Sequence, residues 1–178
     1  MSRHIALLRG INVSGSKKIK MAELRELLTS LGFENVTTVL ASGNVAWNAE
    51  GVDTAAMQTA IEHGIQATFG FSVDIIVMPR AQVERLVASD PFKGVPVTEN
   101  TRLYVTFLPA PPKADLDISY HAPAQDFTIL SVTDIAVCSV LTLSPTSRTV
   151  DSMSILEQKF GKNITTRNWN TVLKLADL

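Results

Sequence analysis

The chain of 178 residues contains one cysteine and three histidines. The lone thiol, Cys138, excludes an intramolecular disulfide and a zinc site built from several cysteines, and its place in the apolar run 135–141 predicts a buried core residue. No two histidines have the spacing of metal ligands, and no two carboxylates stand out as an acid and a base. We therefore expect no metal site and no cofactor, and no catalytic group is identified.

Long apolar runs and an excess of basic charge are also missing. No segment approaches the roughly 20 apolar residues that cross a bilayer, and Arg9 and Asn12 interrupt the only apolar stretch near the start, which argues against a signal peptide. We expect a cytoplasmic protein without membrane contact. The formal net charge of -1 does not favour nucleic acid as a partner, because dedicated nucleic-acid binders are normally basic, although a local basic patch is compatible with it.

The composition, with 46% hydrophobic and 19% charged residues, is that of a folded globular protein. Apolar patterns in the first half predict four strands, at residues 4–8, 36–40, 45–47 and 71–78. Two helices between these strands are predicted to end at Gly32 and Gly70. The order strand, helix, strand, strand, helix, strand is that of a split βαβ, or ferredoxin-like βαββαβ, unit, which predicts an α+β fold.

A boundary near residue 79 divides the chain into predicted subdomains 1–79 and 80–178. The second half reads helix, strand, a short helix around residues 115–120, strand, strand and two helices, the last over residues 168–176. Without its first helix, this order repeats the first half up to its last strand. The second subdomain is therefore predicted to be a related but incomplete β-α-β-β-α unit packed on the first.

The connection between the first strand and the first helix is rich in glycine and cations. Gly10 and Gly15 have the separation found in a P-loop, but Ser16 precedes Lys17, and Lys18 stands where that motif needs a hydroxyl, so we reject a P-loop. Glycines still allow backbone amides to face an anion, and basic side chains add charge. The candidate anion-binding residues are Arg9, Asn12, Lys17, Lys18 and Lys20. The alternative is a solvated connection whose lysines only maintain solubility.

A second polar segment, Ser42-Gly43-Asn44, is predicted to be a turn between two strands, because glycine and asparagine tolerate positive φ. In a split βαβ unit we expect this turn and the first loop to emerge at opposite ends of their shared helix. Ser42 and Asn44 are nevertheless candidate ligand-binding residues. No histidine is placed in the sequence to activate Ser42 as a nucleophile.

A third polar segment, residues 165–171, surrounds Trp169. In a structural interpretation, Thr166 caps the last helix and Trp169 anchors it to the core. In a ligand-binding interpretation, a polar or anionic group is bound by Arg167, Asn168 and Asn170. Arginine suits this role because its planar guanidinium binds carboxylate or phosphate through two hydrogen bonds.

Taken together, these segments resemble the bacterial family known as domain of unknown function 1697. The resemblance covers nearly the whole chain, and its main carriers are residues 6–13 with the lysines that follow, 21–28 with Gly32-Phe33, 42–45, 90–92 and 166–171. It implies a two-part α+β fold, which agrees with the predicted split βαβ unit. It brings no established activity.

Three functions compete. The leading hypothesis is a protein that binds a small anion, a nucleotide or a nucleic-acid phosphate through the basic loop, together with Arg167 and Asn170. The second is an enzyme of unknown reaction with a polar cleft between subdomains, lined by Arg9, Ser42, Asn44 and Arg167. The third is a protein-interaction module without a ligand, which uses an exposed sheet edge. The sequence is compatible with a monomer or a homodimer.

Overall fold

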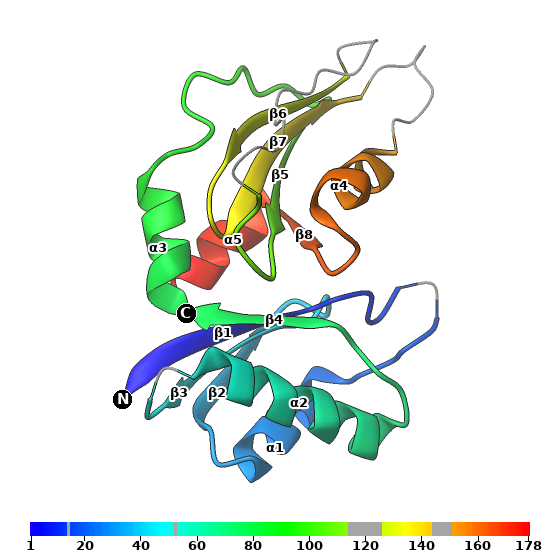
Figure 1. Ribbon diagram of the computed structural model, residues 1–178, viewed down its shortest axis with the longest axis vertical. Coiled ribbons are helices and arrows are strands. Elements are labelled where there is room, and N and C mark those ends of the chain that lie inside the picture. Colours follow the sequence, from blue (N-terminus) through cyan, green and yellow to red (C-terminus); the bar gives the residue numbers. More distant parts are fainter. Residues whose placement is uncertain (14, 52, 114–125, 144–150) are drawn as a thin grey trace. The chain divides into compact units, whose positions relative to one another are not determined.

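The computed structural model describes residues 1–13, 15–51, 53–113, 126–143 and 151–178. The chain forms two compact units, residues 1–85 with 173–178, and residues 86–172. Each unit contains a four-stranded antiparallel sheet with helices, so the predicted α+β fold of two similar subdomains is confirmed (Figure 1). The boundary between the units falls after Arg85, whereas the sequence prediction placed it near residue 79. The last six residues of the chain belong to the first unit.

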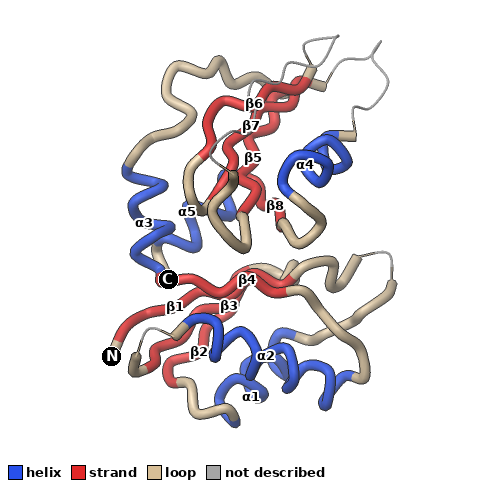
Figure 2. The backbone as a smooth tube through the Cα atoms, in the orientation of Figure 1, coloured by secondary structure: helices blue, strands red, loops and turns tan. Residues whose placement is uncertain are grey.

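The first unit has the predicted order of six elements. They are β1 (Ser2–Leu8), α1 (Met21–Ser30), β2 (Glu34–Val39), β3 (Asn44–Ala49), α2 (Thr54–Phe69) and β4 (Ile75–Pro79). The strand order in the sheet is β2-β3-β1-β4, and β1 pairs antiparallel with both β3 and β4. Both helices cover the same face of this sheet (Figure 2).

Apolar spacing and capping explain the helices of the first unit. Leu24 and Leu28 on α1 are fully buried at i and i+4 spacing and pack in one core cluster with Trp47 of β3. The carboxylate of Asp53 accepts a hydrogen bond of 2.9 Å from the backbone N–H of Ala56 and caps α2. Gly70, with φ of 81°, ends α2 in the left-handed conformation that glycine tolerates best. The end of α2 at Gly70 agrees with the prediction from the sequence.

The second unit repeats the strand arrangement of the first. After α3 (Arg80–Ala88), its elements are β5 (Thr101–Phe107), β6 (Phe127–Val132), β7 (Ala136–Thr142), α4 (Ser152–Phe160) and β8 (Thr165–Asn168). The last helix, α5 (Trp169–Ala176), begins in the second unit, and its residues from Leu173 on belong to the first. The order in the sheet of the second unit is β6-β7-β5-β8, which corresponds strand for strand to β2-β3-β1-β4. The order of strands therefore indicates an internal duplication of the topology.

The sequence did not predict β8, the strand that completes the second sheet. It is four residues long and entirely polar, so it lacks the apolar alternation that marks a half-buried strand. It pairs with β5, where the hydroxyls of Thr106 and Thr166 are 2.7 Å apart.

The predicted helix around residues 115–120 lies outside the described residues. Cys138, on β7, is fully buried as predicted. Within the described ranges, no helix is long and apolar enough to span a membrane.

Candidate functional site

Three connections of the first unit meet at one end of the strands of its sheet, where β1 ends. The backbone N–H of Leu8 donates to the carbonyl of Gly43 at 2.8 Å, and that of Arg9 donates to the carbonyl of Asp74 at 2.9 Å. The strand directions explain this meeting. Because β1 and β2 are both antiparallel to β3, they run in the same direction and finish at the same end of the sheet, where β3 begins. The expectation that the turn before Asn44 lies at the opposite end from the first loop is wrong.

Gly43 allows the turn and the first loop to pack together. A Cβ atom at this position would be 2.7 Å from Leu8 Cβ and 2.9 Å from Ile11 Cδ1, and the residue has φ of +81°. Both distances are too short for real side-chain contacts, so only glycine fits. The turn is further fixed by buried Asn44, whose Nδ2 donates to the carbonyl of Val39 at 2.8 Å and to the Oγ of Ser42 at 3.0 Å.

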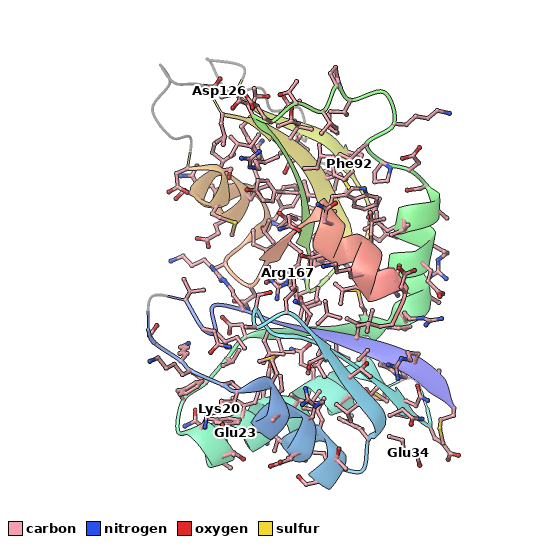
Figure 3. The ribbon with its side chains drawn as sticks, turned by 180° about the vertical axis from the view of Figure 1, so that it is seen from behind. Lys20, Glu23, Glu34, Phe92, Asp126 and Arg167 are labelled. Carbon is pink, nitrogen blue, oxygen red and sulfur yellow. The ribbon has the colours of Figure 1, made fainter. Side chains whose placement is uncertain are left out.

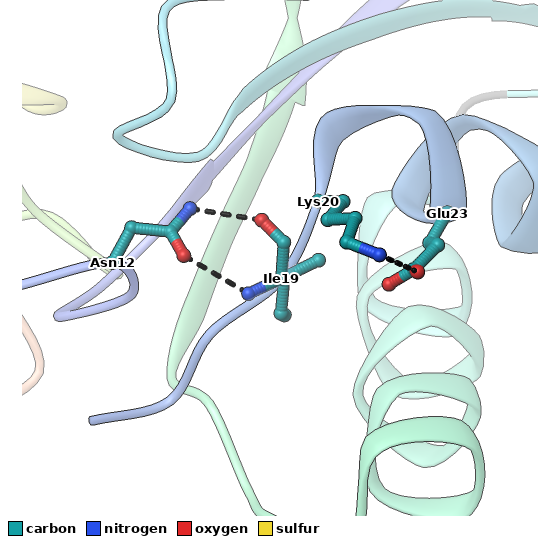
Figure 4. A network of polar contacts seen from close by, with 4 residues as sticks. All are labelled: Asn12, Ile19, Lys20 and Glu23. Carbon is teal, nitrogen blue, oxygen red and sulfur yellow. Dashed lines mark hydrogen bonds and ion pairs between the residues drawn. The ribbon is translucent and has the colours of Figure 1, made fainter. Parts of the chain in front are cut away.

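The side-chain amide of Asn12 organises the first loop (Figure 4). Its Nδ2 donates to the carbonyl of Ile19 at 2.9 Å, and its Oδ1 accepts from the backbone N–H of Ile19 at 2.9 Å. The same Nδ2 donates to the carbonyl of Ala41 at 2.7 Å. Both hydrogens of the amide are thus used within the protein, and Asn12 holds the lysine-bearing segment against the turn.

Lys17 forms a second brace of the loop. Its Nζ donates to the carbonyl of Ser72, in the connection between α2 and β4, at 2.8 Å. Its own carbonyl accepts from the backbone N–H of Asn12 at 3.2 Å, across a short bridge between Val13 and Ser16. Lys17 therefore has a structural contact inside the first unit, and its charge lies beside a backbone carbonyl.

A cavity of about 410 Å³ lies against this braced loop. It is lined by Asn12, Gly15, Lys18, Ile19, Lys20 and Glu23. The ammonium group of Lys20 is 3.2 Å from Oε1 of Glu23 in an ion pair (Figures 3 and 4). In the part of the chain that the structure describes, Lys18 has no hydrogen bond or ion pair. Two lysines and one glutamate are therefore among the residues that line the cavity. Arg9 lies half-buried at the end of β1.

The three candidates of the second unit lie within four residues of one another. Arg167, on β8, is 9% exposed and donates through Nη1 to the hydroxyl of Thr165 at 2.8 Å and to the carbonyl of Thr166 at 3.0 Å. Burial lowers the pKa of Arg167 to about 10, so the guanidinium is still charged at neutral pH. Asn170 is exposed on α5.

Asn168 caps α5, the helix that follows it. Its Oδ1 accepts hydrogen bonds from the backbone N–H of Thr171 at 3.0 Å and from its hydroxyl at 2.8 Å, which is the usual arrangement of an N-cap. The expectation that Thr166 caps this helix is wrong, because Thr166 lies within β8. Trp169 packs edge-on against Phe92, with ring centroids 5.0 Å apart.

The structure thus gathers the candidates into two groups, one in each unit. The first unit brings together the basic loop and the Ser42–Asn44 turn, and the second holds the segment around Arg167. The sequence analysis did not include Glu23 among the candidates, although its spacing of three residues from Lys20 is that of an ion pair on a helix. It also missed Ser72, whose backbone carbonyl leaves no signal in the sequence.

Other parts of the surface do not coincide with the candidates. A larger cavity, of about 620 Å³, is bordered by Phe33, Glu34 and Met57 among others, and none of the sequence-predicted site residues lines it. Figure 3 shows Glu34 far from Lys20 within the first unit. In the described ranges, no three His, Cys, Asp or Glu side chains are grouped to hold a metal ion.

Comparison with known proteins gives a family and a fold. A family model described as a protein of unknown function (DUF1697) matches residues 1–135. A solved structure of a conserved bacterial protein from Streptococcus pneumoniae superposes with a TM-score of 0.73 at 22% sequence identity, and the match covers 99% of this chain and 97% of that one. No curated protein matches the sequence.

Proposed function

The chain belongs to the DUF1697 family, and we propose that its first unit binds a small phosphate-bearing anion at the basic loop. The observation that carries this proposal is the clamp between Asn12 and Ile19. Lys18 and Lys20 are the chain neighbours of Ile19, so the two hydrogen bonds of the clamp fix the backbone between them beside the 410 Å³ cavity. A preorganised backbone lowers the entropy cost of binding.

The proposal divides the predicted residues by role. Lys18 and Lys20 are the residues assigned to contact the anion, because both line the cavity and carry a positive charge. Asn12 and Lys17 are positioning residues, since their polar atoms hold the carbonyls of Ile19, Ala41 and Ser72. Ser42 and Asn44 stabilise the turn that supports the loop. Among the candidates of the second unit, Asn168 has a structural role, because its side chain caps α5.

The cavity favours a compact ligand over a nucleic-acid strand. Its volume of about 410 Å³ is in the range of small-molecule sites. No aromatic side chain is among the described residues on its walls, so it offers no surface on which successive bases could stack, as single-strand binders do. A net charge of -1 also disfavours polyanion binding. The proposed class is therefore a small phosphate compound.

Calorimetric titration with pyrophosphate and ATP at low salt tests the proposal. The double variant Lys18→Ala, Lys20→Ala is expected to weaken binding by at least about tenfold, because each charge-assisted contact contributes about 1.5–3 kcal/mol. The matched control is Lys93→Ala, Lys162→Ala, which removes two exposed lysines of the second unit and is expected to leave affinity unchanged. Equal weakening by both double variants, or by neither, contradicts the proposal.

A further inference from the structure

We infer that Glu23 is an intramolecular competitor for the anion. In the ligand-free protein its carboxylate pairs with Lys20, and an incoming phosphate must displace it to bind both lysines. This inference rests on the proposed function and adds its regulation: the site contains its own counter-anion.

The geometry places the competitor in the site itself. Lys20 is the N-cap residue of α1 and Glu23 lies in its first turn, three residues on. Their charged atoms are 3.2 Å apart, and both residues line the same cavity as Lys18. Figure 4 shows the pair beside the Asn12–Ile19 clamp, which holds the backbone just before Lys20. The carboxylate of Glu23 therefore already pairs with the ammonium group that the anion would bind.

The contact is weak enough to be exchanged. The side chains of Lys20 and Glu23 are 82% and 45% exposed, and ion pairs this open to solvent are weak and screened by salt. Lys20 is the N-cap residue of α1, but its side chain makes no capping hydrogen bond. The ammonium group can therefore change partner without loss of a helix cap. An anion that binds Lys18 and Lys20 together replaces one contact by two.

Displacement does not remove the carboxylate from the neighbourhood. Glu23 stays in the first turn of α1, where the helix dipole favours a negative charge, and it repels the bound anion. Because Coulomb repulsion grows with ligand charge, the carboxylate disfavours a phosphate dianion more than a monoanion. Glu23 thus lowers the affinity of the loop for the anion.

Three variants separate competition from a general change of charge. Glu23→Gln removes the charge and keeps the shape, whereas Glu23→Asp keeps the charge on a shorter side chain that reaches Lys20 less well. Glu26→Gln is the matched control, since Glu26 is an exposed carboxylate on the same helix with no ion pair among the described residues. The probe is methyl phosphate at pH 8, where it is a dianion, and the readout is the dissociation constant from amide shifts of Gly15, Lys18 and Ile19.

Glu23→Gln is expected to tighten methyl phosphate binding about two- to fivefold, with Glu23→Asp between it and the native protein and Glu26→Gln unchanged. Unchanged or weaker binding by Glu23→Gln, while the native protein binds at the loop, overturns this inference and leaves the proposed function standing. Equal tightening by Glu26→Gln also overturns it, because the effect would then be a general one of charge. If methyl phosphate shifts no loop amide in the native protein, the proposed function fails and this inference fails with it.

Discussion

The side-chain amide of Asn12 pairs with the backbone of Ile19 as a neighbouring β-strand would. It donates to the carbonyl of Ile19 and accepts from its N–H, each at 2.9 Å, and it donates once more to the carbonyl of Ala41 at 2.7 Å. One side chain therefore holds the lysine-bearing segment and the turn before β3 at the same edge of the sheet. The backbone of Asn12 has φ of 57°, a conformation that asparagine tolerates better than most residues.

Replacing Asn12 by aspartate tests this clamp with almost no change of shape. The variant cannot donate to the carbonyls of Ile19 and Ala41, and it places a carboxylate against two carbonyl oxygens. We expect Asn12→Asp to lower the free energy of unfolding by about 2 kcal/mol and to weaken phosphate binding, measured by urea denaturation and titration. Asn170→Asp, at an exposed position of α5, is the control and is expected to match the native protein. Native-like stability of Asn12→Asp would contradict the role of the clamp.

Gly43 and Gly10 form a matched pair that separates steric from conformational cost. Both have positive φ, but a Cβ at Gly43 would be 2.7 Å from Leu8 Cβ, whereas a Cβ at Gly10 meets nothing within 4 Å. Gly10→Ala is expected to cost about 1–2 kcal/mol for the left-handed conformation alone. Gly43→Ala adds about 1–3 kcal/mol of overpacking. Urea denaturation of both variants checks the difference, and equal losses would show that the turn does not pack against Leu8.

The dependence of the free energy of unfolding on pH tests the effect of burying His4. Burial lowers the pKa of this imidazole below 6.5, partly offset by a hydrogen bond with the carbonyl of Ser2. The unfolded chain therefore binds a proton at higher pH than the folded protein does. The contribution of His4 to the free energy of unfolding is fully present above pH 6.5 and is lost as the pH falls through the lowered pKa.

We expect His4→Gln to flatten the decline in unfolding free energy between pH 7 and the lowered pKa. His63→Gln, which changes an exposed histidine of α2, is expected to retain the native slope. Denaturant titrations at several pH values give both slopes. A native slope in His4→Gln would mean that another group titrates in this window.

Sequence patterns predicted the first unit well because its elements have strong periodicity and clear ends. Leu24 and Leu28 mark one face of α1, and Gly70 ends α2. The same reasoning missed β8, whose four polar residues are held in place by pairing with β5. A strand stabilised by a partner distant in the sequence leaves little local signal.

The candidate site was predicted only in part for a related reason. The cations of the basic loop are visible in the sequence, but the roles of Asn12 and Lys17 depend on carbonyls of Ala41 and Ser72, which lie 29 and 55 residues away. Residue types do not show which polar atoms will be used by the backbone. Of the cations in the basic loop, Lys18 and Lys20 are the two that line the 410 Å³ cavity, and our proposal assigns the direct contacts to them for that reason.

Anion binding at the basic loop is tested by titrating the ¹⁵N-labelled native protein with inorganic phosphate at low salt and following the amide chemical shifts. Binding at the basic loop is expected to give saturable shifts at Gly15, Lys18, Ile19 and Lys20, and these shifts are expected to be lost in the Lys18→Ala, Lys20→Ala variant. Shifts confined to other residues, or a native protein whose loop amides do not move at millimolar phosphate, would contradict it.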